Sequence, residues 1–140
     1  MVHALKEAWR VLNHPGILID LRPYGLRAPL EVVHGENHHW VGYVDVSLGK
    51  RHDYAADRAV RRVVNEGLFE KIKSDYFNRA YYWASIGDLQ ADLDDVWKED
   101  VIIPFDVMKK AANFLRKSEG AQVRIKLHAK LVVYKKINPR

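Results

Sequence analysis

The stretch from Gln122 to Lys135, QVRIKLHAKLVVYK, has the clearest alternation in this chain of 140 residues. Successive side chains of a β-strand point to opposite faces of a sheet, so the pattern separates apolar from basic residues. One face receives Val123, Ile125, Leu127, Ala129, Leu131 and Val133, and the other receives Arg124, Lys126, His128 and Lys130. The stretch therefore predicts a strand in a sheet with one face packed and one face in water.

The segments before this strand supply the rest of the fold. Further strands are predicted at 17–21, 30–34, 40–48 and 76–84, and helices at 2–12, 53–68, 105–117 and from residue 85 onward. The turn Gly35-Glu36-Asn37 predicts a hairpin, which makes the strands beside it antiparallel. This order of elements predicts an α+β domain, in which a mostly antiparallel sheet of about five strands carries helices on one face.

Local patterns set several boundaries of these elements. Ser85, with Asp88 three residues later, has the spacing of a capping box, and Asp53 is the expected N-cap of the preceding helix. Pro104 is expected to open the helix that follows it. The run Ile17–Leu21 is apolar at almost every position, which predicts a strand buried on both faces.

Composition limits the class of protein. The chain has no cysteine, so it has no disulfide framework and no thiol nucleophile. Its apolar runs are far shorter than the roughly 20 residues of a membrane span, and its first residues lack the apolar centre of a signal peptide. We expect one cytoplasmic domain, residues 1–140, with no membrane partner.

Residues 7–20, EAWRVLNHPGILID, resemble the segment E-x-x-R-V-L-K-P-G-G-x-L-x-x-D of class I S-adenosylmethionine-dependent methyltransferases. In that family the segment forms a helix, a turn and the fifth strand of the sheet. The resemblance continues through residues 53–69 as the next helix and through 76–83 and 123–134 as the terminal antiparallel strands. It implies a fold similar to the C-terminal half of that family, with Asn13-His14-Pro15-Gly16 in place of Lys-Pro-Gly-Gly.

The family holds its cofactor in the first half of the domain, with a Gly-rich loop and an acidic residue at the end of the second strand. Neighbouring glycines of this chain are never closer than seven residues, so it has no such loop. The resemblance therefore implies a chain that binds no cofactor alone and binds S-adenosylmethionine only when an N-terminal half completes it. Such a chain is a methyltransferase fragment that is not catalytic alone and acts in substrate binding or assembly.

Asp20, Arg22 and Tyr24 are the candidate substrate-binding residues. They lie at the end of the predicted strand 17–21 and in the loop after it, where polar groups commonly meet ligands. The resemblance places this loop near the substrate, which makes Arg22 a candidate contact for an anionic or carboxylate group. The alternative is a salt bridge between Arg22 and Asp20 or another carboxylate.

A second cluster of polar residues lies in the predicted hairpin. His34, Glu36, His38 and His39 are metal-ligand types within six residues. Their spacing matches no known ligand pattern, so we expect a polar turn and no metal, with these four residues as weak candidates.

Charge is distributed unevenly. Residues 88–106 contain seven carboxylates and one lysine, a net charge of −6, whereas residues 116–140 have a net charge of +7. The basic residues could contact phosphates, but no nucleic-acid-binding motif accompanies them, so we do not expect nucleic acid as the partner. An uncovered edge on the strand 17–21 favours a homodimer or a cofactor-binding partner domain. The alternatives to a methyltransferase-like domain are a stand-alone binding or dimerisation domain and, less favoured, a basic nucleic-acid-binding module.

Overall fold

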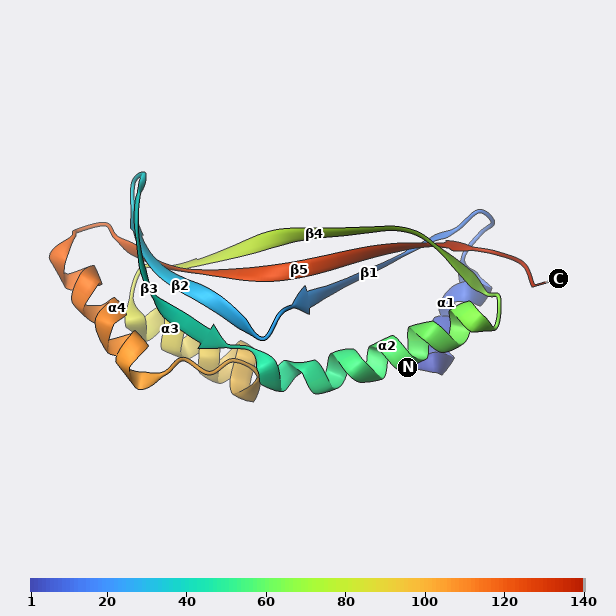
Figure 1. Ribbon diagram of the computed structural model, residues 1–140, viewed down its shortest axis with the longest axis horizontal. Coiled ribbons are helices and arrows are strands. Elements are labelled where there is room, and N and C mark those ends of the chain that lie inside the picture. The colour runs from blue at the N-terminus through green and yellow to red at the C-terminus, as the bar shows by residue number, and fades with distance from the viewer. Residues whose placement is uncertain (140) are drawn as a thin grey trace. The chain divides into compact units, whose positions relative to one another are not determined.

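The computed structural model describes residues 1–139 and has four α-helices and five strands (Figure 1). The helices are α1 (Val2–Val11), α2 (Lys50–Asn65), α3 (Ile86–Asp92) and α4 (Phe105–Lys117). The strands are β1 (Ile17–Tyr24), β2 (Arg27–His34), β3 (Asn37–Asp45), β4 (Phe69–Trp83) and β5 (Gln122–Lys136). Arg140, which the sequence analysis counted among the basic residues, lies outside the described residues.

All five strands belong to one open antiparallel sheet. Its order is β1-β5-β2-β3, and β4 pairs with β5. The prediction of an α+β fold with a mostly antiparallel sheet of about five strands is confirmed.

The chain divides into two compact units, which we call the first and second units. The first contains residues 1–23, 51–77 and the chain from Ala129 on, and the second contains residues 24–50 and 78–128. Strands β4 and β5 therefore contribute to both units. The chain passes repeatedly from one unit to the other within or beside regular elements, so its sequence contains no linker that marks the division.

The first unit packs α1 and α2 against β1, β4 and β5. Val60 and Val63 of α2 meet Phe69, Val132 and Tyr134 in its core. The apolar stripe of α1 covers the same core from Val2 to Leu12. Within this unit both helices lie on the same side of β1 and β5 (Figure 1).

The second unit is built on the hairpin β2–β3, which is antiparallel as predicted. Leu30 and Val32 of β2 pack with Val123 and Ile125 of β5, and helices α3 and α4 complete this core. Gly42 of β3 allows the close approach of α4, because a Cβ at this position would lie 2.6 Å from Cγ2 of Val107.

Two predicted helix starts were correct. Ser85 caps α3, since its Oγ accepts a hydrogen bond from the Asp88 backbone N–H at 3.1 Å. Helix α4 begins immediately after Pro104. Both depend on residues close together in sequence, which explains why they were predictable.

Two other predicted boundaries were wrong. Helix α2 begins at Lys50 and not at Asp53, because a 3₁₀ turn at Ser47–Gly49 leads directly into it. That turn is fixed earlier, where the Asp45 carboxylate accepts a hydrogen bond from the Ser47 backbone N–H at 2.8 Å. Strand β4 begins at Phe69 and not at Tyr76.

The alternation predicted for the last strand holds for only part of β5. Val123, Ile125 and Ala129 are buried as predicted, but farther along the strand the buried residues are Val132, Tyr134 and Lys136. The buried set changes from odd to even positions between Ala129 and Val132, after β5 has entered the first unit at Ala129. A sequence pattern with one continuous period could not show this change.

Candidate functional site

Arg22 is at the centre of a polar cluster in the first unit. Its Nε and Nη2 donate to the two Asp20 carboxylate oxygens at 2.9 and 2.7 Å. Its Nη2 also lies 2.7 Å from Oδ1 of Asp57, and Nη1 donates to the Asp53 carbonyl oxygen at 2.9 Å. The salt bridge that the sequence analysis kept as the alternative is therefore present, and it extends to helix α2.

The electrostatics of this cluster follow from its two carboxylates. Burial by itself lowers the pKa of Arg22, but hydrogen bonds and charge from Asp20 and Asp57 outweigh it and raise the pKa. Nearby Tyr134 also has a raised pKa, caused first by burial and then by the charge of Asp20. Arg22 is thus a cation that already has two anionic partners.

Tyr24, the third candidate of this group, belongs to the second unit. Its ring is about half exposed, and Nζ of Lys50 lies 5.7 Å from the ring centroid. The structure brings Asp20 and Arg22 into direct contact, whereas Tyr24 has its own cation–π neighbour.

The histidines of the β2–β3 hairpin point to different faces. The register pairs Val32 with His39 and Val33 with His38, and adjacent pairs of an antiparallel ladder face opposite sides. His39 stacks on Phe114 of α4, with centroids 5.2 Å apart, while His38 contributes charge near Glu31. Between residues 1 and 139, no three His, Asp or Glu side chains are grouped so that they could hold a metal ion.

His34 and His39 share a small hollow of about 230 Å³ in the second unit. Its wall is completed by Val32, Asn37, Phe114, Lys117, Ser118 and Ala121. The hollow lies at the C-terminal end of α4, where the helix dipole disfavours an anion, and Lys117 supplies an opposing positive charge. These opposing effects give the hollow no clear preference for a charged ligand.

Glu31 organises the basic residues at the start of β5. Arg124 Nε donates to its carboxylate at 2.9 Å, and Lys126 Nζ lies 3.6 Å from it. Burial would raise the pKa of Glu31, but the hydrogen bond and charge of Arg124, with the charges of Lys126 and His38, lower it overall. His128 in turn has a side-chain partner, Asn78, at 2.5 Å. Arg124, Lys126 and His128, three of the residues predicted on the basic face of the last strand, therefore have side-chain partners within the protein.

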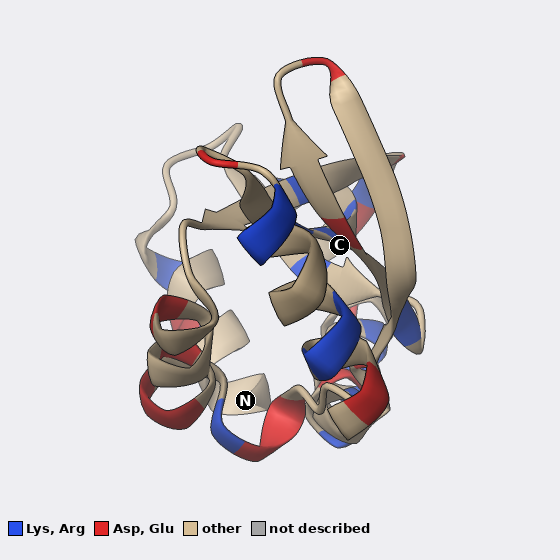
Figure 2. Ribbon diagram, turned by 90° about the vertical axis from the view of Figure 1, so that its left-hand side faces the viewer, with Lys and Arg blue, Asp and Glu red and all other residues tan. Residues whose placement is uncertain are grey.

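The second unit also separates charge between helices. Figure 2 shows Asp and Glu recurring along α3 and the turns that follow it, with Lys and Arg on α4. The acidic residues are Asp88, Asp92, Asp94, Asp95, Glu99 and Asp100, and the basic residues are Lys109, Lys110, Arg116 and Lys117. The acidic segment predicted from the sequence is thus a helical surface.

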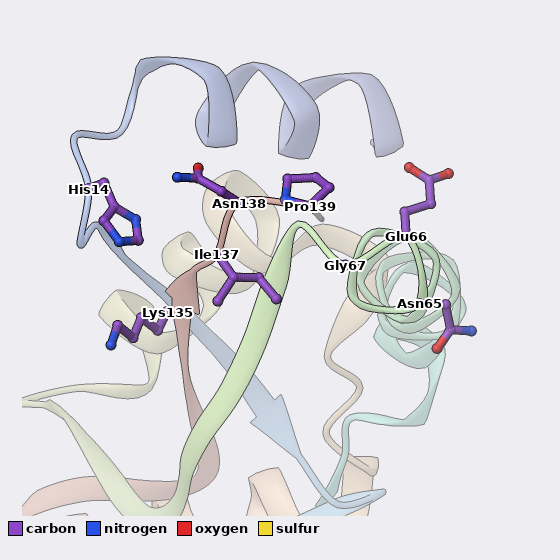
Figure 3. A pocket seen from close by; sticks show the side chains of 8 residues that line it. All are labelled: His14, Asn65, Glu66, Gly67, Lys135, Ile137, Asn138 and Pro139. Atoms are coloured by element: carbon purple, nitrogen blue, oxygen red, sulfur yellow. The ribbon is translucent and has the colours of Figure 1, made fainter.

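A larger hollow of about 650 Å³ lies in the first unit (Figure 3). It is lined by His14, Asn65, Glu66, Gly67, Lys135, Ile137, Asn138 and Pro139. Glu66 is neutralised by Lys6 and Arg62, whose nitrogen atoms lie 2.7 and 3.0 Å from its carboxylate. The hydrogen bond from Lys6 is the main cause of its lowered pKa. His14 and Lys135 lie at the opposite end in Figure 3, where Lys135 supplies a positive charge.

We define the outer face of β1 as the side chains of Ile17, Ile19 and Leu21. The exposure of this face contradicts the prediction made from the sequence. The strand was predicted to be buried on both faces, but these side chains are 47%, 59% and 44% exposed. Leu18 alternates with them and packs into the core of the first unit. The exposed face of β1 is therefore wholly apolar, whereas its covered face holds Leu18 together with Asp20 and Arg22.

Comparisons with known proteins give no further assignment. No family model matches the chain, and neither a curated protein nor a solved structure matches it. None of the helices formed by residues 1–139 is both long enough and apolar enough to cross a membrane.

Proposed function

We propose that this chain is an assembly domain, similar to the C-terminal half of a class I methyltransferase and not catalytic alone. In this proposal a cofactor-binding partner domain docks on the outer face of β1, and S-adenosylmethionine binds only to the resulting complex. The observation that carries the proposal is that this face of β1 is wholly apolar and yet exposed.

The outer face of β1 has the chemistry of a buried layer. Strands of doubly wound sheets are apolar on both sides because helices cover both faces. Burying the exposed halves of three aliphatic side chains would contribute about 2–4 kcal/mol to docking. In the part of the sheet that the structure describes, β1 is the last strand of the order and lies next to β5, so a further strand could pair along Ile17–Leu21.

The polar cluster indicates how an anionic substrate could bind in this proposal. Arg22 is neutralised by Asp20 and Asp57, so the residue expected to contact an anionic substrate is engaged within the chain. Asp57 is the more exposed of the two carboxylates, at 51% against 16% for Asp20. A substrate carboxylate at this site would replace Asp57 and keep the Asp20 pair.

Strand pairing supports the resemblance further. The resemblance implies that the last two strands pair antiparallel, and β4 pairs with β5 in this sheet. One helix precedes β1 along the chain and another precedes β4, an order of elements that supports the resemblance.

Calorimetric titration with S-adenosylmethionine tests the proposal in two steps. The isolated chain should give no saturable heat. The chain is then used as bait in an extract of its own cells, and the retained complex, once purified, should bind S-adenosylmethionine saturably.

Ile19→Lys supplies the specific variant, because it places a charge in the centre of the outer face of β1. It should lose the partner, whereas Lys109→Asp, on exposed α4, should retain it. Saturable cofactor binding by the isolated chain, or a cofactor-binding complex that Ile19→Lys leaves intact, would contradict the proposal.

A further inference from the structure

Strand β4 presents a long open edge. It runs for 15 residues, pairs with β5, and is exposed at every position from Glu70 to Ala80. Neither proline nor glycine interrupts it. Edge strands expose unpaired backbone N–H and C=O groups, and a long uninterrupted edge is a template for another strand.

We propose that two copies of this chain associate by pairing their β4 strands antiparallel, with Ser74 at the twofold axis. The paired segment, Lys71–Phe77, lies wholly within the first unit. This surface is distinct from the outer face of β1, so the inference goes beyond the proposed function.

Charge complementarity identifies a second copy as the occupant. In a register centred on Ser74, Lys73 faces the partner's Asp75, and Asp75 faces the partner's Lys73. Within one chain these two side chains lie 3.9 Å apart and are both more than 60% exposed, and Oδ1 of Asp75 accepts a hydrogen bond from the Tyr76 backbone N–H at 2.9 Å, which pairing with a second strand would replace. Their charges are therefore accessible to a neighbouring strand, where directly opposed opposite charges are stabilising.

Neighbouring registers are disfavoured by the same charges. Directly opposed residues of an antiparallel pair point to the same face of the sheet. When a twofold axis perpendicular to the sheet relates the two strands, this condition places the axis between two copies of the same residue. An axis at Lys73 would set two lysines against each other, and an axis at Asp75 would oppose two aspartates. The axis at Ser74 avoids both repulsions.

Apolar side chains match in the same register. Ile72 and Tyr76 are 53% and 56% exposed and lie on the opposite face of β4 from the charged pair. With the axis at Ser74, Ile72 faces the partner's Tyr76 on both sides of the axis. Pairs of aromatic and β-branched residues are among the favourable cross-strand pairs.

Sedimentation equilibrium over a concentration series tests the association with charge-swapped variants. Lys73→Asp and Asp75→Lys should each raise the dimer Kd about tenfold or more, because each sets like charges opposite each other twice. The double variant Lys73→Asp/Asp75→Lys restores both pairs and should recover a Kd close to the original.

Lys109→Asp and Glu119→Lys are controls with the same changes in net charge at exposed positions of the second unit, and they should leave the Kd unchanged. A chain that stays monomeric at several hundred micromolar would overturn the inference. So would a dimer that ignores the single swaps, or a double variant that stays weak, as expected if Asp75 instead faced the partner's Arg79.

Discussion

Arg22 donates to both carboxylate oxygens of Asp20, at 2.9 and 2.7 Å. The same guanidinium reaches the carboxylate of Asp57 and the carbonyl oxygen of Asp53 on helix α2. One side chain therefore joins the end of β1 to a helix that follows about 30 residues later. This planar fork of donors is particular to arginine, since a lysine presents a single ammonium group.

Arg22→Lys should lower the free energy of unfolding by about 1–2 kcal/mol, because the ammonium cannot satisfy both carboxylates and the carbonyl together. Urea denaturation followed by tryptophan fluorescence measures the change. Arg58→Lys, at an exposed position of α2, is the matched control and should be neutral. Equal losses in the two variants would show that the fork contributes nothing specific.

Glu31 should make stability depend on pH. Its folded-state pKa lies below the ordinary value of 4.5, so the carboxylate contributes stability above that value and loses it as pH falls through the folded-state pKa. Glu31→Gln should cost about 1–3 kcal/mol at pH 7 and should flatten the loss of stability in acid. Unfolding free energies measured from pH 7 to pH 3 test both effects, with exposed Glu119→Gln as the control.

Lys136 should stabilise the end of α1. Its Nζ donates to the Leu12 carbonyl oxygen at 2.7 Å and lies 4.5 Å from the centroid of the Trp9 ring. Lys136→Met keeps the apolar stem but leaves that carbonyl without its donor, which should cost about 1–3 kcal/mol in thermal or urea unfolding. Lys135→Met, at the adjacent and more exposed position, should change stability by less than about 0.5 kcal/mol.

Gly42→Ala should destabilise the second unit. The added methyl would lie 2.6 Å from Cγ2 of Val107, a buried β-branched residue that cannot easily move, so we expect a loss of about 1–3 kcal/mol. At Gly87 in α3, the nearest atom to an added methyl is Oγ of Ser85, 3.7 Å away. Gly87→Ala should therefore stabilise the protein by about 0.5 kcal/mol through helix propensity. The same direction of change in both variants would contradict the packing argument.

Features that depend on neighbours in sequence were predictable. The Ser85 cap, the start of α4 after Pro104 and the hairpin turn at Gly35 each involve residues within a few positions. The helix at 50–65 shows the limit, because its start depends on the contact between Asp45 and Ser47 and the turn after it. An N-cap residue type at Asp53 could not reveal that the helix had already begun.

The candidate residues show the same limit. Asp20 and Arg22 are two residues apart on one face of a strand, so their salt bridge could be anticipated. The contact with Asp57 could not, because only the packing of α2 beside β1 brings that carboxylate near. The hairpin register likewise separates His38 from His39, although they are adjacent in sequence.

The sequence alone determined that the chain forms an α+β domain, because apolar periodicity is a local property of each helix and strand. It also determined that Ile17, Ile19 and Leu21 give β1 one wholly apolar face. Only the tertiary structure decided which face is covered: α1 and α2 pack against Leu18 and leave Ile17, Ile19 and Leu21 exposed. The physical reason is that burial depends on which elements meet in space, and the same dependence changes the buried positions of β5 between Ala129 and Val132.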